Sequence, residues 1–165
     1  ADKSGKFFED NDERSIFFCR GVLETVKKLG WSPDIIHCHG WMTNLVPLYV
    51  KKVYRDNPLF ADSKVIYSVY DDDFEPVLHK NFGKKVKLDG ITNKDLDEYY
   101  KTPSFVNITK AAVDYSDALI IGSEKINQDV NGFIKDSGKP VLPYQDMETY
   151  IDAYSSFYDE ILDKE

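Results

Sequence analysis

Short apolar, β-branched runs alternate along this chain with longer segments whose apolar residues recur at helical spacing. The short runs have the length and composition of buried strands, at residues 34–38, 64–70, 118–121 and 140–142. The helical segments are residues 10–30, 42–53, 102–115, 123–138 and 147–162. Because the two kinds of segment alternate, the pattern predicts right-handed crossovers. We therefore expect an α/β protein with a Rossmann-like parallel sheet of about four strands, flanked by helices on both faces.

Local signals refine these segments. Pro47 lies inside the second helix and removes a backbone donor, so that helix either bends there or begins close to it. Gly122 and Ser123 are expected to cap the helix that follows the third strand. Residues 74–101 form a long connection with one short helix near 93–100. The last helix carries an aromatic stripe, which we expect to pack in the core: Tyr154, Phe157 and Tyr158.

Length and composition indicate a single domain over residues 1–165, with 42% hydrophobic and 30% charged residues. The aromatic share of 14% indicates a well-packed core, with a sugar-contacting surface as the alternative. A net charge of −8 argues against nucleic acid as a partner, because a surface that binds nucleic-acid phosphates carries many basic side chains. No apolar run approaches a membrane span, so no membrane partner is expected. The spacing of Cys19 and Cys38 does not match a disulfide framework. We expect both to be free, buried thiols in a reducing, cytoplasmic compartment.

The most distinctive stretch is Pro33 to Trp41, which contains two of the three histidines. In an open α/β sheet, ligands bind outside the carboxyl ends of the strands, where His37 and His39 are predicted to lie. The two side chains point the same way because strand faces alternate, and Cys38 points the other way. His37 is deeper in the strand and is expected to be structural. His39 is the candidate functional residue, and no other ligands are spaced to complete a zinc site.

A second cluster of chemical groups, Asp71 to Asp73, follows the second strand. Such carboxylates could hold a divalent cation or bind sugar hydroxyls, and they are equally typical of a solvated turn. The backbone at Gly122 and Ser123 offers a weak anion-binding signal. The chain contains no phosphate-binding glycine motif and no nucleophile elbow. From these residues alone, the function stays open.

Three segments, in the same order, resemble one family. The stretch W-S-P-D-I-I-H-C-H-G-W, followed by Leu45, Pro47, Leu48 and Tyr49, resembles the W-x-P-D-V-V-H-x-H-D-W segment of bacterial glycogen synthases and plant starch synthases. These are family 5 glycosyltransferases of the GT-B fold. The run D-N-D-E-R from Asp10 resembles their D-N-x-x-R-F helix, with Ser15 in place of Phe. The third match covers Lys110, Ala111, Tyr115, Asp117 and Ser123.

The resemblance covers about residues 10–130 and corresponds to part of the N-terminal, acceptor-side domain. It implies transfer of glucose from ADP-glucose to an α-1,4-glucan, with retention, without an obligatory metal and with no further cofactor. In that scheme His39 is the catalytic residue at the sugar site, where a neutral imidazole donates a hydrogen bond to the transferred glucose. We expect Trp41, Tyr70 and Asp71 to bind the substrate.

The departures from the family pattern change this expectation. Gly40, Met42 and Tyr70 stand where the family has Asp, His and His. A lysine- and glycine-containing loop and the nucleotide-binding second domain have no counterpart in this sequence, which looks like a truncated or single-domain relative. Catalysis by this chain alone is therefore not expected. The alternative is a non-catalytic glucan-binding or regulatory module, and a metal-dependent phosphate or sugar enzyme ranks third.

The same resemblance predicts an open sheet edge. GT-B sheets of this kind place a further strand beside the one that carries H-x-H, and this sequence has no such strand. An unpaired apolar edge is a liability that proteins usually cover. We expect a homodimer through the exposed edge, a swapped element or a missing upstream segment.

Overall fold

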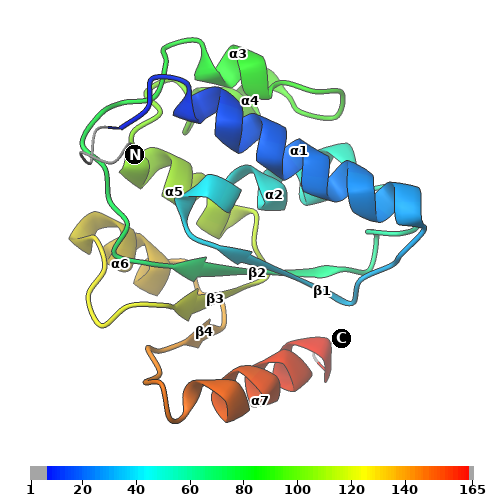
Figure 1. Ribbon diagram of the computed structural model, residues 1–165, viewed down its shortest axis with the longest axis vertical. Coiled ribbons are helices and arrows are strands. Elements are labelled where there is room, and N and C mark those ends of the chain that lie inside the picture. Colours follow the sequence, from blue (N-terminus) through cyan, green and yellow to red (C-terminus); the bar gives the residue numbers. More distant parts are fainter. Residues whose placement is uncertain (1–6, 164–165) are drawn as a thin grey trace.

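A four-stranded parallel sheet organises the chain (Figure 1). The structure is a computed structural model that describes residues 7–163. The strands lie side by side in chain order: β1 (Ile35–His39), β2 (Lys64–Val69), β3 (Ala118–Ile121) and β4 (Val141–Leu142). His39 lies opposite Ser68, and Val69 lies opposite Ile121, so the carboxyl ends of β1, β2 and β3 meet at one end of the sheet. The predicted α/β fold with a Rossmann-like parallel sheet of about four strands is confirmed.

Helices cover both faces of this sheet. Within residues 7–163 they are α1 (Asn11–Leu29), α2 (Leu45–Leu48), α3 (Phe82–Val86), α4 (Asn93–Asp97), α5 (Phe105–Asp114), α6 (Gln128–Asp136) and α7 (Tyr150–Asp163). Figure 1 shows α1, α2 and α5 on one face and α7 alone on the other. None of the described helices is long and apolar enough to cross a membrane.

The segment after β1 is not one straight helix. A 3₁₀ turn (Trp41–Thr43), α2 and a π-helical turn (Tyr49–Val53) follow one another. Pro47 is the third residue of α2, where the missing N–H would have had no partner within the helix. The expectation that the helix begins close to Pro47 is confirmed.

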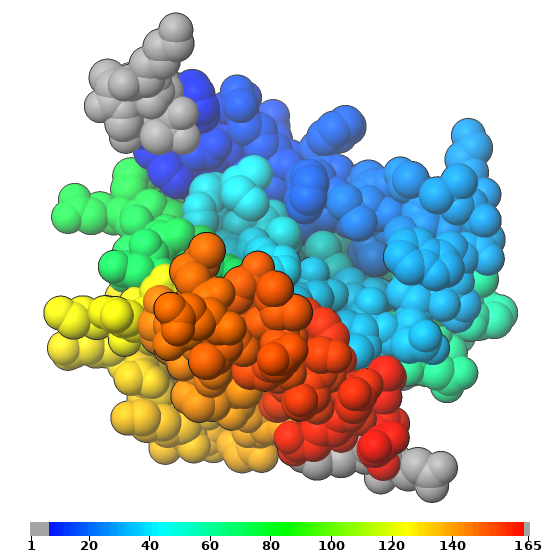
Figure 2. Space-filling model, turned by 60° about the horizontal axis from the view of Figure 1, so that its bottom comes forward, coloured from blue at the N-terminus to red at the C-terminus, as the bar shows by residue number. Residues whose placement is uncertain are grey.

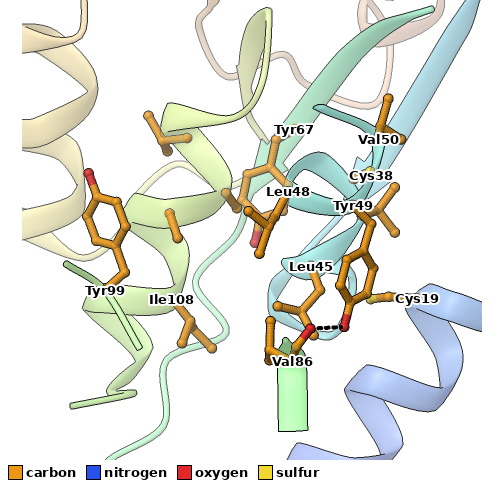
Figure 3. Close-up of a cluster of buried hydrophobic side chains, with 14 of the residues drawn as sticks. Cys19, Cys38, Leu45, Leu48, Tyr49, Val50, Tyr67, Val86, Tyr99 and Ile108 are labelled. Atoms are coloured by element: carbon orange, nitrogen blue, oxygen red, sulfur yellow. Dashed lines mark hydrogen bonds between the residues drawn. The ribbon is translucent and has the colours of Figure 1, made fainter. Parts of the chain in front are cut away.

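The main core lies between the sheet and the helices α1, α2 and α5, and it is rich in aromatic residues (Figure 3). Tyr49 and Tyr67 are almost fully buried, and the Tyr49 hydroxyl donates to the Val86 carbonyl oxygen at 3.4 Å. Cys19 and Cys38 are buried free thiols in this core, as predicted. Burial raises the pKa of the Cys19 thiol to about 12, which makes it unreactive at neutral pH.

A second, smaller core lies between the other face of the sheet and α7. Phe157 and Ile161 pack on strand residues that include Ile66 and Ile120. Figure 2 shows the C-terminal segment, coloured orange to red, gathered on this face of the molecule. The predicted aromatic stripe therefore does pack in a core. The apolar face is shorter than predicted, because α7 begins at Tyr150 and Ile151 remains 65% exposed.

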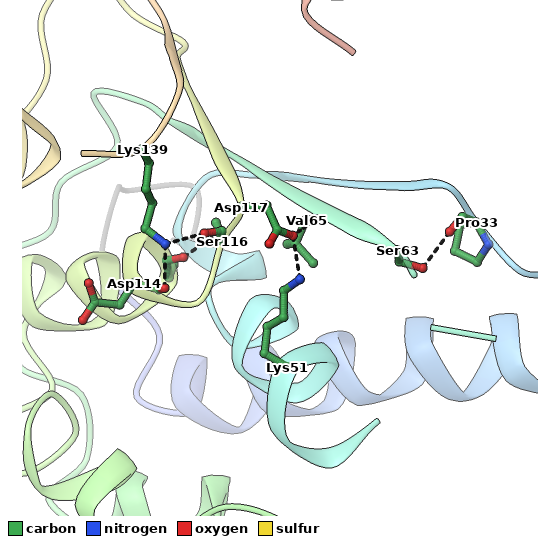
Figure 4. A network of polar contacts seen from close by, with 9 residues as sticks. Pro33, Lys51, Ser63, Val65, Asp114, Ser116, Asp117 and Lys139 are labelled. Atoms are coloured by element: carbon green, nitrogen blue, oxygen red, sulfur yellow. Dashed lines mark hydrogen bonds and ion pairs between the residues drawn. The ribbon is translucent and has the colours of Figure 1, made fainter. Parts of the chain in front are cut away.

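Polar contacts hold the amino ends of the strands (Figure 4). One carboxylate oxygen of Asp117, just before β3, accepts from Lys51 Nζ at 2.6 Å and from the Val65 N–H at 2.7 Å. Lys139, just before β4, donates from Nζ to the carbonyl oxygens of Asp114 and Ser116. These contacts fix where β2, β3 and β4 begin, at the end of the sheet opposite the candidate site.

Two local predictions are wrong. Ser123 does not cap the next helix: α6 begins at Gln128, and the Asn127 side chain accepts from the Asp129 and Val130 N–H groups. Asparagine is an equally good cap and stands directly before the helix. The connection 74–101 contains α3 as well as the expected α4.

Candidate functional site at the carboxyl ends of the strands

Glycine shapes the turn that follows β1. Gly40 has φ 68° and ψ 178°, a backbone conformation that side chains disfavour. A Cβ atom at position 40 would lie 2.6 Å from Asp72 Oδ2. The same oxygen accepts the Trp41 N–H at 3.0 Å, so the Asp72 carboxylate fills the space beside Gly40 and holds the start of the 3₁₀ turn. Burial raises the pKa of Asp72, partly offset by this hydrogen bond.

A second glycine accommodates Tyr70 at the end of β2. A Cβ atom at Gly122 would lie 2.5 Å from the Tyr70 ring, so the ring lies directly across the end of β3. This packing directs the Tyr70 hydroxyl toward β1, where it lies 2.8 Å from His39 Nδ1. Tyr70 and His39 are therefore brought together by the sheet.

The two histidines of β1 form a stacked pair, with ring centroids 3.9 Å apart. His37 has both ring nitrogens engaged: Nδ1 lies 2.6 Å from the Tyr158 hydroxyl and Nε2 lies 2.7 Å from the Ser68 hydroxyl. Burial, and next the charge of His39, lower the pKa of His37 to about 3. His37 is thus a neutral, fully bonded side chain, as expected for a structural histidine.

His39 is the more accessible ring of the pair. Its side chain is exposed, and its Nε2 atom has no hydrogen-bond partner within residues 7–163. Partial burial lowers the pKa of His39, so the ring is neutral at pH 7. His39 therefore offers one unoccupied ring nitrogen at the end of the sheet where ligands of α/β proteins bind.

A groove of about 540 Å³ runs beside this pair along the open edge of β1. His37 and His39 line it together with apolar side chains of α1 and the following turn: Phe18, Val22, Met42 and Val46. Within the described chain, β1 pairs only with β2. The predicted open, apolar sheet edge is therefore present.

An aromatic pocket of about 680 Å³ opens on the other side of the same strand end. Its rings are Phe7, Phe8, Trp41 and Phe74, and the Phe74 centroid lies 4.8 Å from those of Phe7 and Trp41. Arg14 and Asp72 add charged groups at the rim. Trp41 therefore lines a pocket separate from the His39 groove, although both belong to one turn.

Sequence reasoning missed Phe74 as a pocket residue, and it proposed Asp71 to Asp73 as a cluster without giving Asp72 a role of its own. The carboxylates at 71–73 were a signal for this place, but their directions depend on the turn. The Asp71 side chain is exposed, and the Asp71 backbone N–H donates to Ser123 Oγ, whereas the Asp73 carboxylate accepts from Asn127 Nδ2 at 2.6 Å. Because these side chains diverge, they do not share a cation. Among residues 7–163, no group of three or more His, Cys, Asp or Glu side chains is arranged to hold a metal ion.

Fold and site together define a Rossmann-like α/β domain whose polar and aromatic groups gather at the carboxyl ends of its strands. A family model described as the starch synthase catalytic domain matches residues 1–137. A glycogen synthase from Chlorobium phaeovibrioides is 36% identical over 120 residues, which are 73% of this chain and 24% of that protein. A glycogen synthase from Chlorobium limicola is 33% identical over 129 residues, 78% of this chain and 26% of that protein.

The fold agrees with these matches. The solved catalytic domain of starch synthase IV from Arabidopsis thaliana, bound to ADP and acarbose, superposes with a TM-score of 0.68 at 17% identity over 88% of this chain and 32% of that one. The chain belongs to the starch synthase catalytic-domain family. It spans about a quarter of the length of the curated glycogen synthases that it matches.

Proposed function

We propose that this chain is part of a glucosyltransferase that takes glucose from ADP-glucose and adds it to an α-1,4-glucan. The observation that carries the proposal is the neutral His39 ring, with an unoccupied Nε2 atom at the carboxyl end of β1. As a donor, this nitrogen would bind the transferred glucose and stabilise the charge that develops on it. Membership of the family and an ADP- and acarbose-bound structural relative support this choice of ligands.

The other predicted contacts have suitable chemistry for sugar. Trp41 offers a half-buried aromatic ring, on which a sugar face can pack, and Asp71 an exposed carboxylate that can accept from sugar hydroxyls. Tyr70 stands beside His39. We propose that these four residues bind the glucan and the transferred glucose. The buried free thiols support a reducing, cytoplasmic location.

We do not expect residues 7–163 to transfer glucose by themselves. Stabilising the transition state requires positioned donors on both sides of the reacting sugar and its leaving group. The described site supplies one wall of such a cleft, with His39 as its candidate catalytic group. Binding of glucan without transfer is therefore the expected behaviour of this chain alone.

A non-catalytic glucan-binding module is the second candidate, and the aromatic pocket favours it. Its four aromatic rings and its charged side chains suit a carbohydrate chain, and neither feature depends on a nucleotide sugar. Under this alternative, Phe74 and Trp41 would carry the affinity, and His39 would contribute little.

Calorimetry with maltoheptaose, together with transfer of labelled glucose from ADP-glucose to glycogen, tests both candidates. We expect His39→Ala and Trp41→Ala to weaken maltoheptaose binding about tenfold or more, whereas Met147→Ala, at an 86% exposed residue away from the site, leaves it unchanged. Phe74→Ala weakening binding while His39→Ala has no effect would favour the module. Absence of maltooligosaccharide binding by the unaltered chain would overturn both. Transfer that His39→Ala abolishes would make the chain an enzyme in its own right.

We also propose that two copies associate through the open edge of β1. By strand alternation, Ile35, His37 and His39 direct their backbone N–H and C=O groups to that edge, where a second β1 can pair about a twofold axis. Phe18 and Val22, 47% and 39% exposed, would become covered.

Analytical ultracentrifugation at micromolar concentrations tests this association. Val22→Glu places a charge in the groove and should shift the protein toward monomer. Leu29→Glu, on the same helix but outside the groove, is the matched control and should leave the dimer intact. A monomer for the unaltered chain would overturn the proposal.

A further inference from the structure

A line of hydrogen-bonding side chains runs from α7 to His39. It begins with the Tyr158 hydroxyl, 2.6 Å from His37 Nδ1, and continues from His37 Nε2 to Ser68 Oγ at 2.7 Å. Tyr70 follows on the same strand: burial raises the pKa of Tyr70, and the Ser68 hydroxyl opposes this effect. The line ends at the 2.8 Å contact between the Tyr70 hydroxyl and His39 Nδ1.

The direction of the hydrogen bonds follows from the chemistry of the members. A neutral imidazole donates from one ring nitrogen and accepts at the other, so within each histidine the direction at one nitrogen fixes the direction at the other. At both links between tyrosine and histidine, the phenol O–H is the better donor and the imidazole nitrogen the better acceptor. Tyr158 therefore donates to His37 Nδ1, His37 Nε2 donates to Ser68, and Tyr70 donates to His39 Nδ1.

The hydrogen bond from Tyr70 determines which ring nitrogen of His39 carries the hydrogen. When Nδ1 of a neutral imidazole accepts, the ring hydrogen resides on Nε2. For His39 this is the atom without a partner in the described chain. Burial lowers the pKa of both rings and keeps them neutral, and two imidazolium ions with centroids 3.9 Å apart would in addition repel each other.

We propose that Tyr70 and Tyr158 are positioning residues, which hold His39 as the Nε2–H tautomer so that it donates a hydrogen bond to an oxygen atom of a bound sugar. Tyr70 acts directly, and Tyr158 acts through His37, whose ring lies against that of His39. The inference rests on the proposed function for the identity of the ligand. It adds that α7, more than 100 residues away in sequence, helps to set the chemistry of the site.

Ser68 has a single hydrogen, and a second tyrosine competes for it. The pKa of Tyr154 is raised by burial and by the nearby Tyr70, and a hydrogen bond from Ser68 opposes these effects. Tyr154 lies on the same helix as Tyr158, but it is not a link in the line. Tyr154→Phe is therefore a matched control, since it removes a hydroxyl from α7 and leaves every link in place.

Long-range ¹H–¹⁵N correlation spectra of the ¹⁵N-histidine-labelled, ligand-free chain at neutral pH test the inference. We expect His39 to show a protonated Nε2 and a bare Nδ1. Tyr70→Phe should replace this single-tautomer pattern with averaged shifts, and Ser68→Ala and Tyr158→Phe should produce smaller shifts in the same direction. Tyr154→Phe should leave the pattern unchanged. A protonated Nδ1 in the unaltered chain would mean that the line runs in the opposite direction, and the inference would fail.

A binding measurement separates this inference from the proposed function. Tyr70→Phe keeps the ring against Gly122, and its maltoheptaose affinity should fall about threefold to tenfold, the effect of one misdirected hydrogen bond. If the tautomer behaves as expected but no sugar binds, the proposed function fails and the positioning stands. If sugar binds and Tyr70→Phe changes neither tautomer nor affinity, the positioning fails alone. Tyr158→Phe provides the second test should Tyr70→Phe not fold.

Discussion

The ring of Tyr70 occupies the space that a side chain at position 122 would need. A Cβ atom there would lie 2.5–2.8 Å from three atoms of the ring, closer than a real contact permits. Either the ring or the end of β3 must therefore move when residue 122 acquires a side chain. Because the hydroxyl of this ring contacts His39, the shift would reach the candidate site.

Gly122→Ala should lower the free energy of unfolding by about 1–3 kcal/mol, the usual cost of overpacking. Gly132→Ala is the control, because Gly132 lies within α6 with no atom in reach of its added methyl group, and the helix should gain about 0.5–1 kcal/mol. Urea unfolding followed by circular dichroism measures both. Equal effects of the two substitutions would show that the Tyr70 ring yields freely.

His37 makes stability depend on pH. Its pKa is about 3 in the folded chain, against an ordinary value of 6.5, so below pH 6.5 the unfolded chain binds a proton that the folded chain does not. Stability is therefore complete above pH 6.5 and falls as the pH falls. The slope should be at most about 1.4 kcal/mol per pH unit between pH 6.5 and about 5, above the range of most carboxylates.

Urea unfolding at a series of pH values measures this slope. His37→Gln should flatten it, whereas substitution of the exposed His79 by Gln should leave it as it is. A slope that persists in His37→Gln would assign the effect to His39, whose pKa is lowered by burial in the same direction.

The strand pattern was enough to predict that His37 and His39 share a face, because alternation is a local property. The partners of these rings could not be predicted. Tyr158 is 121 positions from His37, and the contact between Tyr70 and His39 depends on the register between β1 and β2. A shift of one residue would have directed Tyr70 to the other face.

At the scale of elements, α7 is attached mainly through two apolar side chains. Phe157 and Ile161 are 5% and 4% exposed, whereas Ile151 and Leu162 on the same helix are 65% and 42% exposed. The helix lies alone on one face of the sheet (Figure 1), and its attachment depends on this narrow apolar stripe.

Phe157→Ala should therefore destabilise the chain by about 3 kcal/mol, since it removes the largest side chain of the smaller core. Ile151→Ala should change stability by no more than about 0.5 kcal/mol. Thermal unfolding of both variants gives the comparison. A small effect of Phe157→Ala would show that α7 is held by its tyrosine contacts to His37 and Ser68 instead.

Long periodic elements were predictable, and short ones were decided by single contacts. α3 has only Phe82 and Val86 as apolar anchors, four residues apart in a lysine-rich stretch, and both are buried. Its Lys85 pairs with Asp12 and Glu13 of α1, at 2.8 Å in each case. The spacing of Phe82 and Val86 was the helical signal in this part of the sequence, and one such pair does not distinguish a helix from a loop. Ser123 and Asn127 were equally good caps on propensity, and the path of the turn decided between them.

For the whole molecule, two cores of different size share one sheet. β2 lies between them: Val65, Tyr67 and Val69 face the larger core and Ile66 the smaller. The apolar side chains of α7 pack only in the smaller core. The molecule should therefore open in parts, with α7 leaving before the sheet breaks.

Native-state hydrogen exchange measures this order. Amides of α7 should exchange with a lower free energy of opening than amides of β2, and mild urea should widen the set of α7 amides that open together. Identical free energies in both elements would show that the two cores unfold as one unit.

The Asp72 carboxylate beside Gly40 also restricts the order in which this site can change by mutation. With Asp72 in place, any side chain at position 40 meets its oxygen at 2.6 Å, and the φ of 68° strains a side chain there even when that space is free. Losing Asp72 first leaves the Trp41 N–H without its acceptor. Each single step is therefore costly, and changing both residues together removes the clash but leaves the strain, so a side chain at position 40 should be accepted only where the turn after β1 also takes another backbone conformation.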